Sequence, residues 1–218
     1  MLPSVFVRNL GLQAYRPVYE AMKRFARANH EAVQDEIWLV EHLPVYTMGK
    51  SPLLGETRTS INGIEVVSVD RGGDITYHGP GQIVIYPLLH LKQRGIYIKT
   101  YIQILEESAV RTLEEFGIDA FVHPKAPGVY VHCAGGFGEF AELAKIASVG
   151  VHLSNGCTYH GLSLNVDMDL TPFAAITPCG YKSLRMTDMR SLESSVDIKS
   201  VTDRLLSNLL SLLEQHGN

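Results

Sequence analysis

Hydrophobic residues recur along the chain at two spacings, one helical and one typical of strands. Helical spacing joins the apolar positions of residues 15–26, and again those of residues 101–116. Gly117 follows the second set in the manner of a glycine that ends a helix. Leucines between 205 and 213 give the end of the chain an apolar face, and residues 200–203 resemble a capping box before it. The pattern predicts three helices.

Short apolar runs rich in β-branched residues separate these helices, and Gly, Asn and Pro turns bound them. The segment 133–143 has no such pattern and is interpreted as a surface excursion. Strands and helices in this order predict an α+β fold, with helices packed on a mixed, largely antiparallel β-sheet, in one domain over residues 1–218. The predicted strands are 37–42, 64–69, 82–89, 128–132, 146–152 and 159–166.

Composition narrows the class of protein. The 218 residues are 45% hydrophobic and 19% charged, which is ordinary for a folded chain. The net charge of -4 argues against nucleic acid as a partner. We see neither a signal peptide at the N-terminus nor an apolar run of the ~20 residues that span a membrane. The odd set of Cys133, Cys157 and Cys179 fits a reducing compartment, so we expect a cytoplasmic protein without a membrane partner.

A glycine-rich loop leads into the strand predicted at 82–89. Residues 71–82 read RGGDITYHGPGQ, with four glycines, one arginine and one histidine. Glycine loses much conformational freedom on folding, so such a loop indicates positive φ angles or close approach of the backbone to another group. We expect a ligand to lie against this main chain.

A metal site is a weaker hypothesis. Cys157 and His160 resemble half of a zinc site, and His132 with Cys133 offers another pair. Structural zinc sites generally combine two short-spaced pairs such as Cys-x₂-Cys, and the chain has no second pair of that kind and no His-Glu-x-x-His. We therefore predict no metal.

Five segments in the same order together resemble those of the bacterial lipoyl(octanoyl) transferases. The resemblance covers nearly the whole chain, and the long RGG segment combined with PCG is highly specific. It implies the fold of the biotin and lipoate ligases. The segments are RGGDITYHGPGQ (71–82), APGVYV (126–131), KIASVGV (145–151), YHGLSLNV (159–166) and ITPCG (176–180).

The resemblance also implies an activity and its partners. The family moves an octanoyl or lipoyl group from acyl carrier protein to a lysine of lipoate-dependent enzyme subunits. The acceptors would be the lipoyl domains of 2-oxoacid dehydrogenases and the H protein of glycine cleavage. The acyl group arrives on the phosphopantetheine arm of its carrier, so no cofactor is expected in the protein itself.

By the same resemblance, Cys179 is the nucleophile and Lys145 its partner lysine. The other motif positions are thought to line the acyl site. They are Arg71, Gly72, Gly73, Asp74, Ile75, Thr76, Tyr77, His78, Ser148, Val149, Gly150, Gly161, Leu162 and Ser163.

The chemistry of these residue types supports that pairing. A thiol with a pKa near ~8.5 is mostly protonated at neutral pH, so a cysteine nucleophile needs a base or a positive charge beside it. A buried Lys145 would accept the thiol proton and then hold the thiolate as an ammonium. Acyl-cysteine formation followed by attack of a lysine amine needs no ATP and predicts ping-pong kinetics. Backbone amides of residues 79–81, or those near Cys179, are candidates to stabilise the oxyanion.

Each residue also has an ordinary structural interpretation. A single lysine such as Lys145 is usually a surface charge, and Lys125 stands nearby. Arg71 would form a surface salt bridge with Asp70 or Asp74. His78 and His160 would be hydrogen-bonded structural residues, although we place both near the site. Cys133 and Cys157 are expected to be dispensable.

Two other functions stay open at this stage. One is an ATP-dependent lipoate or biotin ligase of the same fold, which ATP dependence would reveal. The other is a non-catalytic module that binds acyl carrier or lipoyl domains. Because such partners are usually acidic, we also predict a basic docking face. Its candidates are Lys92, Arg94, Lys99, Lys182, Arg185 and Arg190.

Overall fold

The computed structural model describes residues 4–28, 34–50, 58–133, 140–177, 184–193 and 195–217. Its helices are α1 (Tyr15–Ala28), α2 (Ile98–Glu115), the 3-10 helix η2 (Thr171–Ala175), α3 (Met189–Leu192) and α4 (Ile198–His216). Its strands are β1 (Val5–Gln13), β2 (Asp35–His42), β3 (Val45–Met48), β4 (Ser60–Ile61), β5 (Ile64–Ser68), β6 (Ile75–His78), β7 (Gln82–Leu88), β8 (Ala120–His123), β9 (Ala126–His132), β10 (Leu143–Ser154), β11 (Cys157–Asn165) and β12 (Arg185–Met186).

Two sheets form the framework of the described chain. The large sheet has the order β1-β2-β7-β11-β10-β9-β8, and β12 pairs with β10 outside this path. The small sheet has the order β4-β5-β3-β6. Strand pairs β1–β2, β10–β12 and β3–β5 are parallel and the other pairs are antiparallel. The expected mixed, largely antiparallel α+β architecture is confirmed.

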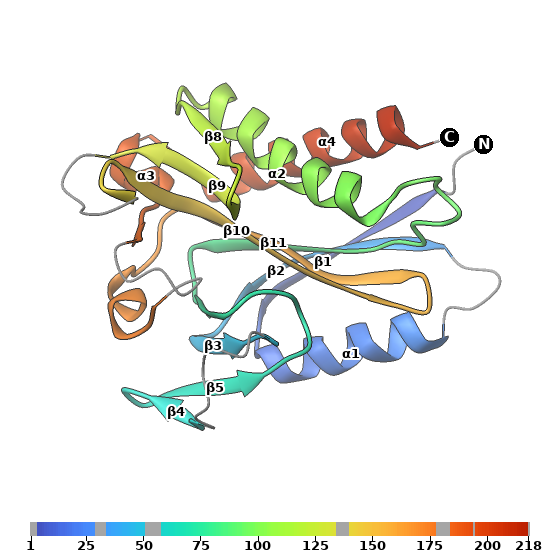
Figure 1. Cartoon of the computed structure of the whole chain (residues 1–218), viewed down its shortest axis with the longest axis horizontal. Coiled ribbons are helices and arrows are strands. Elements are labelled where there is room, and N and C mark those ends of the chain that lie inside the picture. Colours follow the sequence, from blue (N-terminus) through green and yellow to red (C-terminus); the bar gives the residue numbers. More distant parts are fainter. Residues whose placement is uncertain are drawn as a thin grey trace.

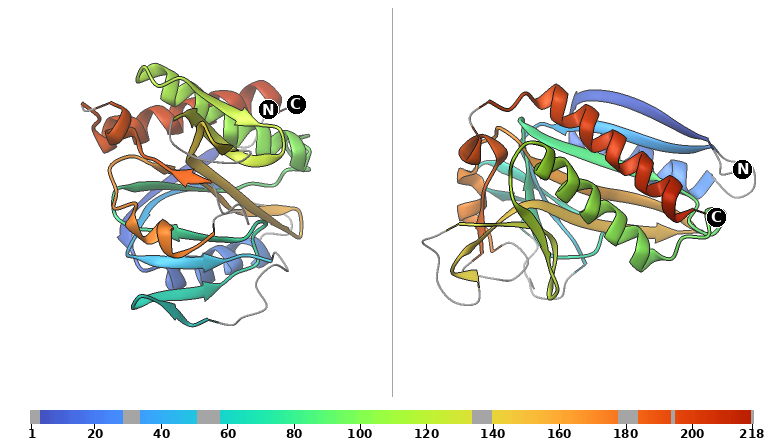
Figure 2. Two further views of the ribbon diagram at one scale, coloured as in Figure 1. Left: turned by 60° about the vertical axis from the view of Figure 1, so that its left-hand side comes forward. Right: turned by 90° about the horizontal axis from the view of Figure 1, so that it is seen from above.

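Helices cover both faces of the large sheet. Helices α2 and α4 lie side by side over one face, as Figures 1 and 2 show from two directions. Helix α1 lies on the opposite face, on the same side as the small sheet (Figure 1). The structure is therefore layered, with the small sheet and α1 on one side and the α2–α4 pair on the other.

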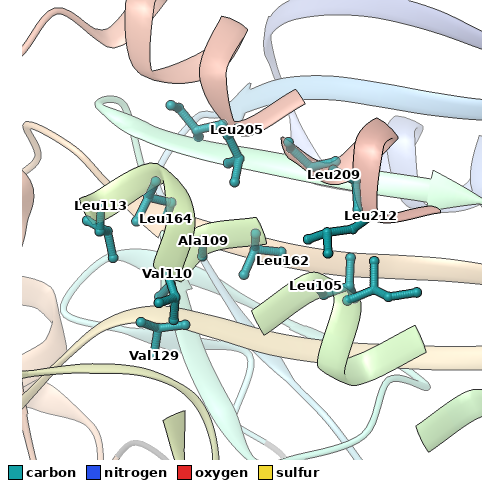
Figure 3. Packing of buried hydrophobic residues seen from close by; sticks show 14 of the residues in the cluster. Leu105, Ala109, Val110, Leu113, Val129, Leu162, Leu164, Leu205, Leu209 and Leu212 are labelled. Carbon is teal, nitrogen blue, oxygen red and sulfur yellow. The ribbon is translucent and has the colours of Figure 1, made fainter. Parts of the chain in front are cut away.

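The main hydrophobic core fills the layer between the large sheet and the α2–α4 pair. Side chains of both helices form one cluster with Val129 of β9 and with Leu162 and Leu164 of β11 (Figure 3). Burial of such side chains, at about 1.5–3 kcal/mol each, fixes both helices on the sheet. The labelled members are Leu105, Ala109, Val110, Leu113, Val129, Leu162, Leu164, Leu205, Leu209 and Leu212.

Each helix and strand expected from the hydrophobic pattern is present, with ends that differ by a few residues. Gly117 follows α2 with φ +74°, a left-handed conformation that favours glycine at the end of a helix. The capping box expected at 200–203 is wrong. Asp197 caps α4 instead, because its side chain accepts a hydrogen bond from the Ser200 N–H and the helix begins at Ile198.

The chain also contains strands that its pattern did not reveal. Strand β1 precedes the first helix, and its exposed edge position explains why its apolar alternation is weak. Part of the glycine-rich loop, Ile75–His78, forms β6 and pairs with β3. Phe140, in the segment expected on the surface, is only 1% exposed. Its ring stacks on Tyr130, so this end of the segment belongs to the interior.

Among the described residues, every helix is too short or too polar to cross a membrane.

A buried ion pair ties the turn after β7 to the start of β2. Asp35 is fully buried, and its carboxylate accepts from Arg94 Nε at 2.5 Å and from the His90 backbone N–H at 2.9 Å. Arg94 is 2% exposed. The expectation that Arg94 belongs to a docking face is therefore wrong, because its guanidinium serves this interior contact.

Removing one member of this pair should be costly, since it leaves the other charge buried without its counter-ion. We expect Asp35→Ala to lower the free energy of unfolding by about 3–5 kcal/mol, measured by urea denaturation. Asp203→Ala removes the exposed carboxylate that contacts Lys199 at 2.9 Å and is the control, with a change within experimental error. Equal losses in the two variants would contradict this account.

Candidate active site

A cavity is lined by residues of both sheets and by the start of α1. Its volume of about 60 Å³ is several times the roughly 10–15 Å³ that one water needs. The segment 71–74 and β6 contribute from the side of the small sheet, and β7, β10 and β11 contribute from the large sheet. Lining residues are Tyr15, Arg71, Gly72, Gly73, Asp74, Ile75, Thr76, His78, Val84, Tyr86, Lys145, Ser148, Val149, Gly150, His160, Gly161, Leu162 and Ser163.

The structure brings together around this cavity every candidate site residue of the sequence analysis except Tyr77 and Cys179. Lys145 and 148–150 come from β10, and 161–163 come from the neighbouring β11. Cys179 lies outside the described residues, as does Lys182. The catalytic and binding roles of the lining residues remain predictions.

Tyr77 does not line the cavity. On strand β6 successive side chains point to opposite faces, so Tyr77 turns away from the side that presents Thr76 and His78. Its ring packs on Phe173, with the centroids 5.5 Å apart. A Cβ at Gly79 would lie 2.4 Å from the Tyr77 hydroxyl, so this glycine makes room for the tyrosine.

Arg71 is buried, which overturns its interpretation as a surface salt bridge. Its guanidinium donates to the Thr47 carbonyl at 2.6 Å, to the Thr47 hydroxyl at 2.9 Å and to the Gly72 carbonyl at 3.0 Å. Thr47 lies on β3, so these bonds fix the glycine-rich segment to the small sheet. The aliphatic part of the arginine covers Gly150, where a Cβ would lie 3.0 Å from Arg71 Cδ.

Asp70 and His160 connect the same segment to the large sheet. The Asp70 carboxylate contacts His160 Nε2 at 3.0 Å and accepts from the Tyr159 hydroxyl at 2.5 Å. Although partial burial opposes it, hydrogen bonds from His160 and Tyr159 hold the pKa of Asp70 well below its usual range. His160 has φ +59°, an uncommon backbone conformation for a residue with a side chain. His160 Nδ1 faces the Tyr15 hydroxyl at 3.4 Å.

Two further buried histidines stand next to the cavity. His42 Nδ1 lies 3.1 Å from the Gln13 carbonyl, which only accepts, so this nitrogen donates and Nε2 accepts from Tyr86 at 2.8 Å. Burial lowers the pKa of His42 to about 4 and, with the nearby His42, that of His78 to about 3. His78 bonds Gln82 Oε1 at 2.7 Å. These rings are neutral at physiological pH.

Lys145 is 1% exposed, so it is not a surface charge. Its Nζ donates to the Pro127 carbonyl at 2.7 Å and lies 5.2 Å from the centre of the Tyr130 ring. Strand β10 has a bulge between Lys145 and Ala147, which alters the regular alternation of side chains at this point. Lys125, the alternative lysine, is exposed in the turn before β9.

The chain that follows the PCG motif returns directly beside Lys145. Strand β12 pairs in parallel with β10, with Met186 opposite Lys145. The Thr187 N–H then donates to the Lys145 carbonyl at 3.0 Å. Leu184 is buried in the cluster that contains Tyr130 and Phe140. The described chain on the C-terminal side of the motif is therefore anchored on the lysine's own strand.

The glycines of the motifs serve different purposes. A Cβ at Gly161 would lie 2.2 Å from the Ile85 carbonyl oxygen, so packing of β11 against β7 requires this glycine. A Cβ at Gly72 has only the Val151 oxygen nearby, at 3.7 Å, so the space beside Gly72 is open. Close approach of a ligand to the main chain is therefore a better explanation at Gly72 than at Gly161.

Backbone amides of residues 79–81, expected as oxyanion donors, do not line the cavity. The Gly81 N–H donates to the Glu41 carboxylate at 2.8 Å, and Gly81 packs against Asp167. The Gly81 N–H is therefore already bonded within the protein, while the choice of oxyanion donor stays a prediction. Within the described ranges, no group of three or more His, Cys, Asp or Glu side chains is arranged to hold a metal ion.

Sequence reasoning missed Tyr15, Val84 and Tyr86 as lining residues. Tyr15 sits at the start of α1 and was interpreted only as part of the helix's apolar face. A tyrosine inside the apolar run of β7 needs a partner for its hydroxyl, and this signal pointed to a buried polar site. Nothing comparable distinguishes Val84.

Because burial keeps its histidines neutral, the folded protein should lose stability as the pH falls. The unfolded chain takes up protons below pH ~6.5 while His42 and His78 do not until about pH 4 and 3. Each of these two histidines lowers the free energy of unfolding by about 1.4 kcal/mol for each pH unit below ~6.5. Urea denaturation between pH 6.5 and 5 measures the slope. His42→Gln should reduce it by about that amount, and an unchanged slope would contradict the assignment.

Comparison with known proteins identifies the family to which the chain belongs. The sequence matches the lipoyl protein ligase A/B catalytic domain family over residues 17–210. It is 44% identical over 210 residues to an octanoyltransferase of Klebsiella pneumoniae strain 342, covering 96% of this chain and 93% of that protein. It is 45% identical to an octanoyltransferase of Burkholderia lata, covering 99% of this chain and 89% of that protein.

Solved structures share the fold at low sequence identity. A bipartite lipoate protein ligase of Thermoplasma acidophilum superimposes with a TM-score of 0.70 at 14% identity, over 98% of this chain and 84% of that chain. A biotin protein ligase of Aquifex aeolicus, in complex with biotin and ATP, gives 0.54 at 14% identity, over 97% and 71%. The biotin and lipoate ligase fold is thereby confirmed. The chain belongs to the lipoyl protein ligase A/B catalytic domain family and, within it, to the octanoyltransferases of protein lipoylation.

Proposed function

We propose that the chain transfers an octanoyl or lipoyl group through a thioester on Cys179, with Lys145 as the acid and base. The donor is an acyl group on the phosphopantetheine arm of acyl carrier protein. The acceptor is a lysine of a lipoyl domain or of the glycine cleavage H protein. The observation that carries the proposal is the buried Lys145 in a cavity lined by the motif residues, with the chain after the PCG motif paired to its strand.

Two acyl transfers complete the reaction without ATP. In the first, the Cys179 thiolate attacks the carrier thioester, a new C–S bond forms and the carrier thiol leaves with a proton from Lys145. In the second, the acceptor amine attacks the acyl-cysteine and gives a proton to Lys145, and the Cys179 thiolate leaves. An amide replaces a thioester in this second step, which makes the overall transfer favourable.

The surroundings of Lys145 suit a group that gives and takes a proton. The Pro127 carbonyl accepts a hydrogen bond from the Lys145 Nζ, and the face of the Tyr130 ring can attract a cation. A buried, water-poor site gives that charge a larger effect on a nearby thiolate than it would have at the surface. These contacts support a lysine that stabilises the thiolate before attack and donates its proton afterwards.

The cavity supports binding of an extended fatty chain. On β10 its lining residues are Lys145 and 148–150, a span of roughly 17 Å at about 3.4 Å per residue, which is longer than an eight-carbon chain. Val149 and Leu162 provide apolar surface, and the open side of Gly72 admits a chain against the backbone. Arg71 and His78 form the polar part of the wall.

The proposal also covers the cellular compartment and the surface on which partner proteins dock. We take residues 1–218 as one catalytic domain that acts in the cytoplasm, a reducing compartment in which Cys133 and Cys157 stay unoxidised. Lys92, Lys99 and Arg190 are exposed and remain candidates to steer acidic partners, although Arg190 also contacts Asp167 at 3.4 Å.

An octanoyl adduct on Cys179 is the direct test. After mixing with octanoyl-acyl carrier protein and no ATP, intact-mass and peptide mass spectrometry should find one octanoyl group on the Cys179 peptide. Cys179→Ser should carry no such thioester and should lose transfer, while the control Cys133→Ser keeps both. Transfer that requires ATP would favour a ligase, and undiminished transfer by Cys179→Ala would end the proposal.

Replacing the lysine tests its role separately. We expect Lys145→Met to lower kcat by about 10²–10⁴-fold, the range of general acid–base catalysis, while the folded state is retained. Lys125→Met, which removes an exposed lysine two residues before Pro127, should leave kcat near the wild-type value. A kcat for Lys145→Met within about twofold of wild type would exclude general acid–base catalysis by this lysine.

A further inference from the structure

Glu106 is a buried carboxylate on helix α2. Its side chain is 6% exposed, and the preceding residue, Leu105, belongs to the main hydrophobic core. Burying a carboxylate costs free energy unless hydrogen bonds compensate. Glu106 Oε1 accepts from the Gly128 N–H at 2.8 Å. The carboxylate is thus directed at the backbone of β9.

The same peptide group carries Lys145 on its other side. Pro127 C=O and Gly128 N–H belong to one planar peptide unit. The carbonyl accepts from Lys145 Nζ at 2.7 Å, and the N–H donates to Glu106 at 2.8 Å. An ammonium, a peptide group and a carboxylate therefore form one row of hydrogen bonds. Such a row polarises the peptide, because each bond strengthens the other.

Gly128 makes this arrangement possible. Its φ is +118°, and a Cβ there would lie 2.6 Å from the Ala147 carbonyl oxygen and 3.0 Å from Lys145 Cε. The lysine side chain passes where another residue would carry its side chain. The peptide that joins the two charges is consequently held in a single orientation.

The charges also interact through space. Burial raises the pKa of Glu106, and the Gly128 N–H and the positive charge of Lys145 oppose that rise. Attraction between opposite charges is mutual, so the Glu106 carboxylate also attracts the Lys145 side chain. From the other packed elements, Tyr130 on β9 faces the ammonium, Arg71 lines the same cavity, and Arg185 on β12 donates to the Cys133 carbonyl.

We propose that Glu106 is a positioning residue for Lys145, acting through the peptide between Pro127 and Gly128. It orients the lysine and keeps it in the ammonium form at the stage where it must donate a proton. This inference rests on the acid and base role proposed above for Lys145. Glu106 lies on α2, outside the motifs and outside the cavity lining, and would still affect the transfer reaction.

Glu106→Gln is the informative variant, because its amide oxygen can still accept from Gly128 while the charge is gone. We expect kcat to fall by about tenfold with little change in KM. We also expect the alkaline limb of the kcat–pH profile to move to lower pH by about half to one unit, since the ammonium loses a stabilising charge. A purely structural role would not move this limb.

Two further variants separate charge from shape. Glu107→Gln removes the neighbouring carboxylate of α2, which pairs with Arg111 at 2.8 Å on the surface, and should leave both kcat and the limb unchanged. Glu106→Asp keeps the charge and should keep the limb near its wild-type position, even where the shorter side chain lowers the melting temperature.

A measurement without substrates distinguishes this inference from the proposed reaction. With lysines labelled at Cε by ¹³C, and the Lys145 signal assigned by Lys145→Arg, NMR follows the loss of its proton as the pH rises. The loss should occur at lower pH in Glu106→Gln than in wild type or Glu107→Gln. Identical titrations would overturn the inference, whatever Cys179 does. If Glu106→Gln alters the titration of Lys145 but Lys145→Met does not affect transfer, the proposed reaction is wrong and the link between Glu106 and Lys145 stands.

Discussion

An ammonium group in the interior of a sheet has to be satisfied by the chain around it, and much of the site follows from this condition. Lys145 is carried inward by β10, where the bulge before Ala147 alters the regular alternation of side chains. The Pro127 carbonyl accepts a hydrogen bond from the Lys145 Nζ, and the Tyr130 ring faces the same group. Gly128 has to be a glycine for the lysine to pass. The return of β12 beside the same residue places the chain after the PCG motif within this framework.

On the opposite side of the cavity, other buried polar groups are likewise paired with partners in the protein. Arg71 is held by Thr47, and Asp70 binds His160, so the glycine-rich segment is tied to both sheets at once. Buried polar groups that are fully paired make a site rigid and specify one arrangement. The cavity therefore has a defined wall, and burial keeps His78 in that wall neutral.

A framework of this kind is shared with enzymes that use different chemistry. The biotin and lipoate ligases have the same fold at low identity, so the fold by itself does not decide between ATP-dependent ligation and acyl transfer. Membership among the octanoyltransferases comes from the high identity over nearly the whole chain. What the structure contributes is the environment of one lysine, including the peptide group that links it by hydrogen bonds to a carboxylate on α2.

Local patterns were sufficient for the helices and for the long strands, because each depends on residues close together in sequence. The KIASVGV and YHGLSLNV segments were placed with the glycine-rich loop only by resemblance to a family, and the structure brings all three around one cavity. Tyr77 could not be excluded, and Tyr15, Tyr86 and the true surroundings of Arg94 could not be found, since each depends on which segment packs against it. Glu106 and Gly128 are 22 residues apart and Glu106 and Lys145 are 39 apart in the chain. The hydrogen bonds that link these residues exist only because α2 packs against β9. A local sequence pattern does not show which distant segments pack together.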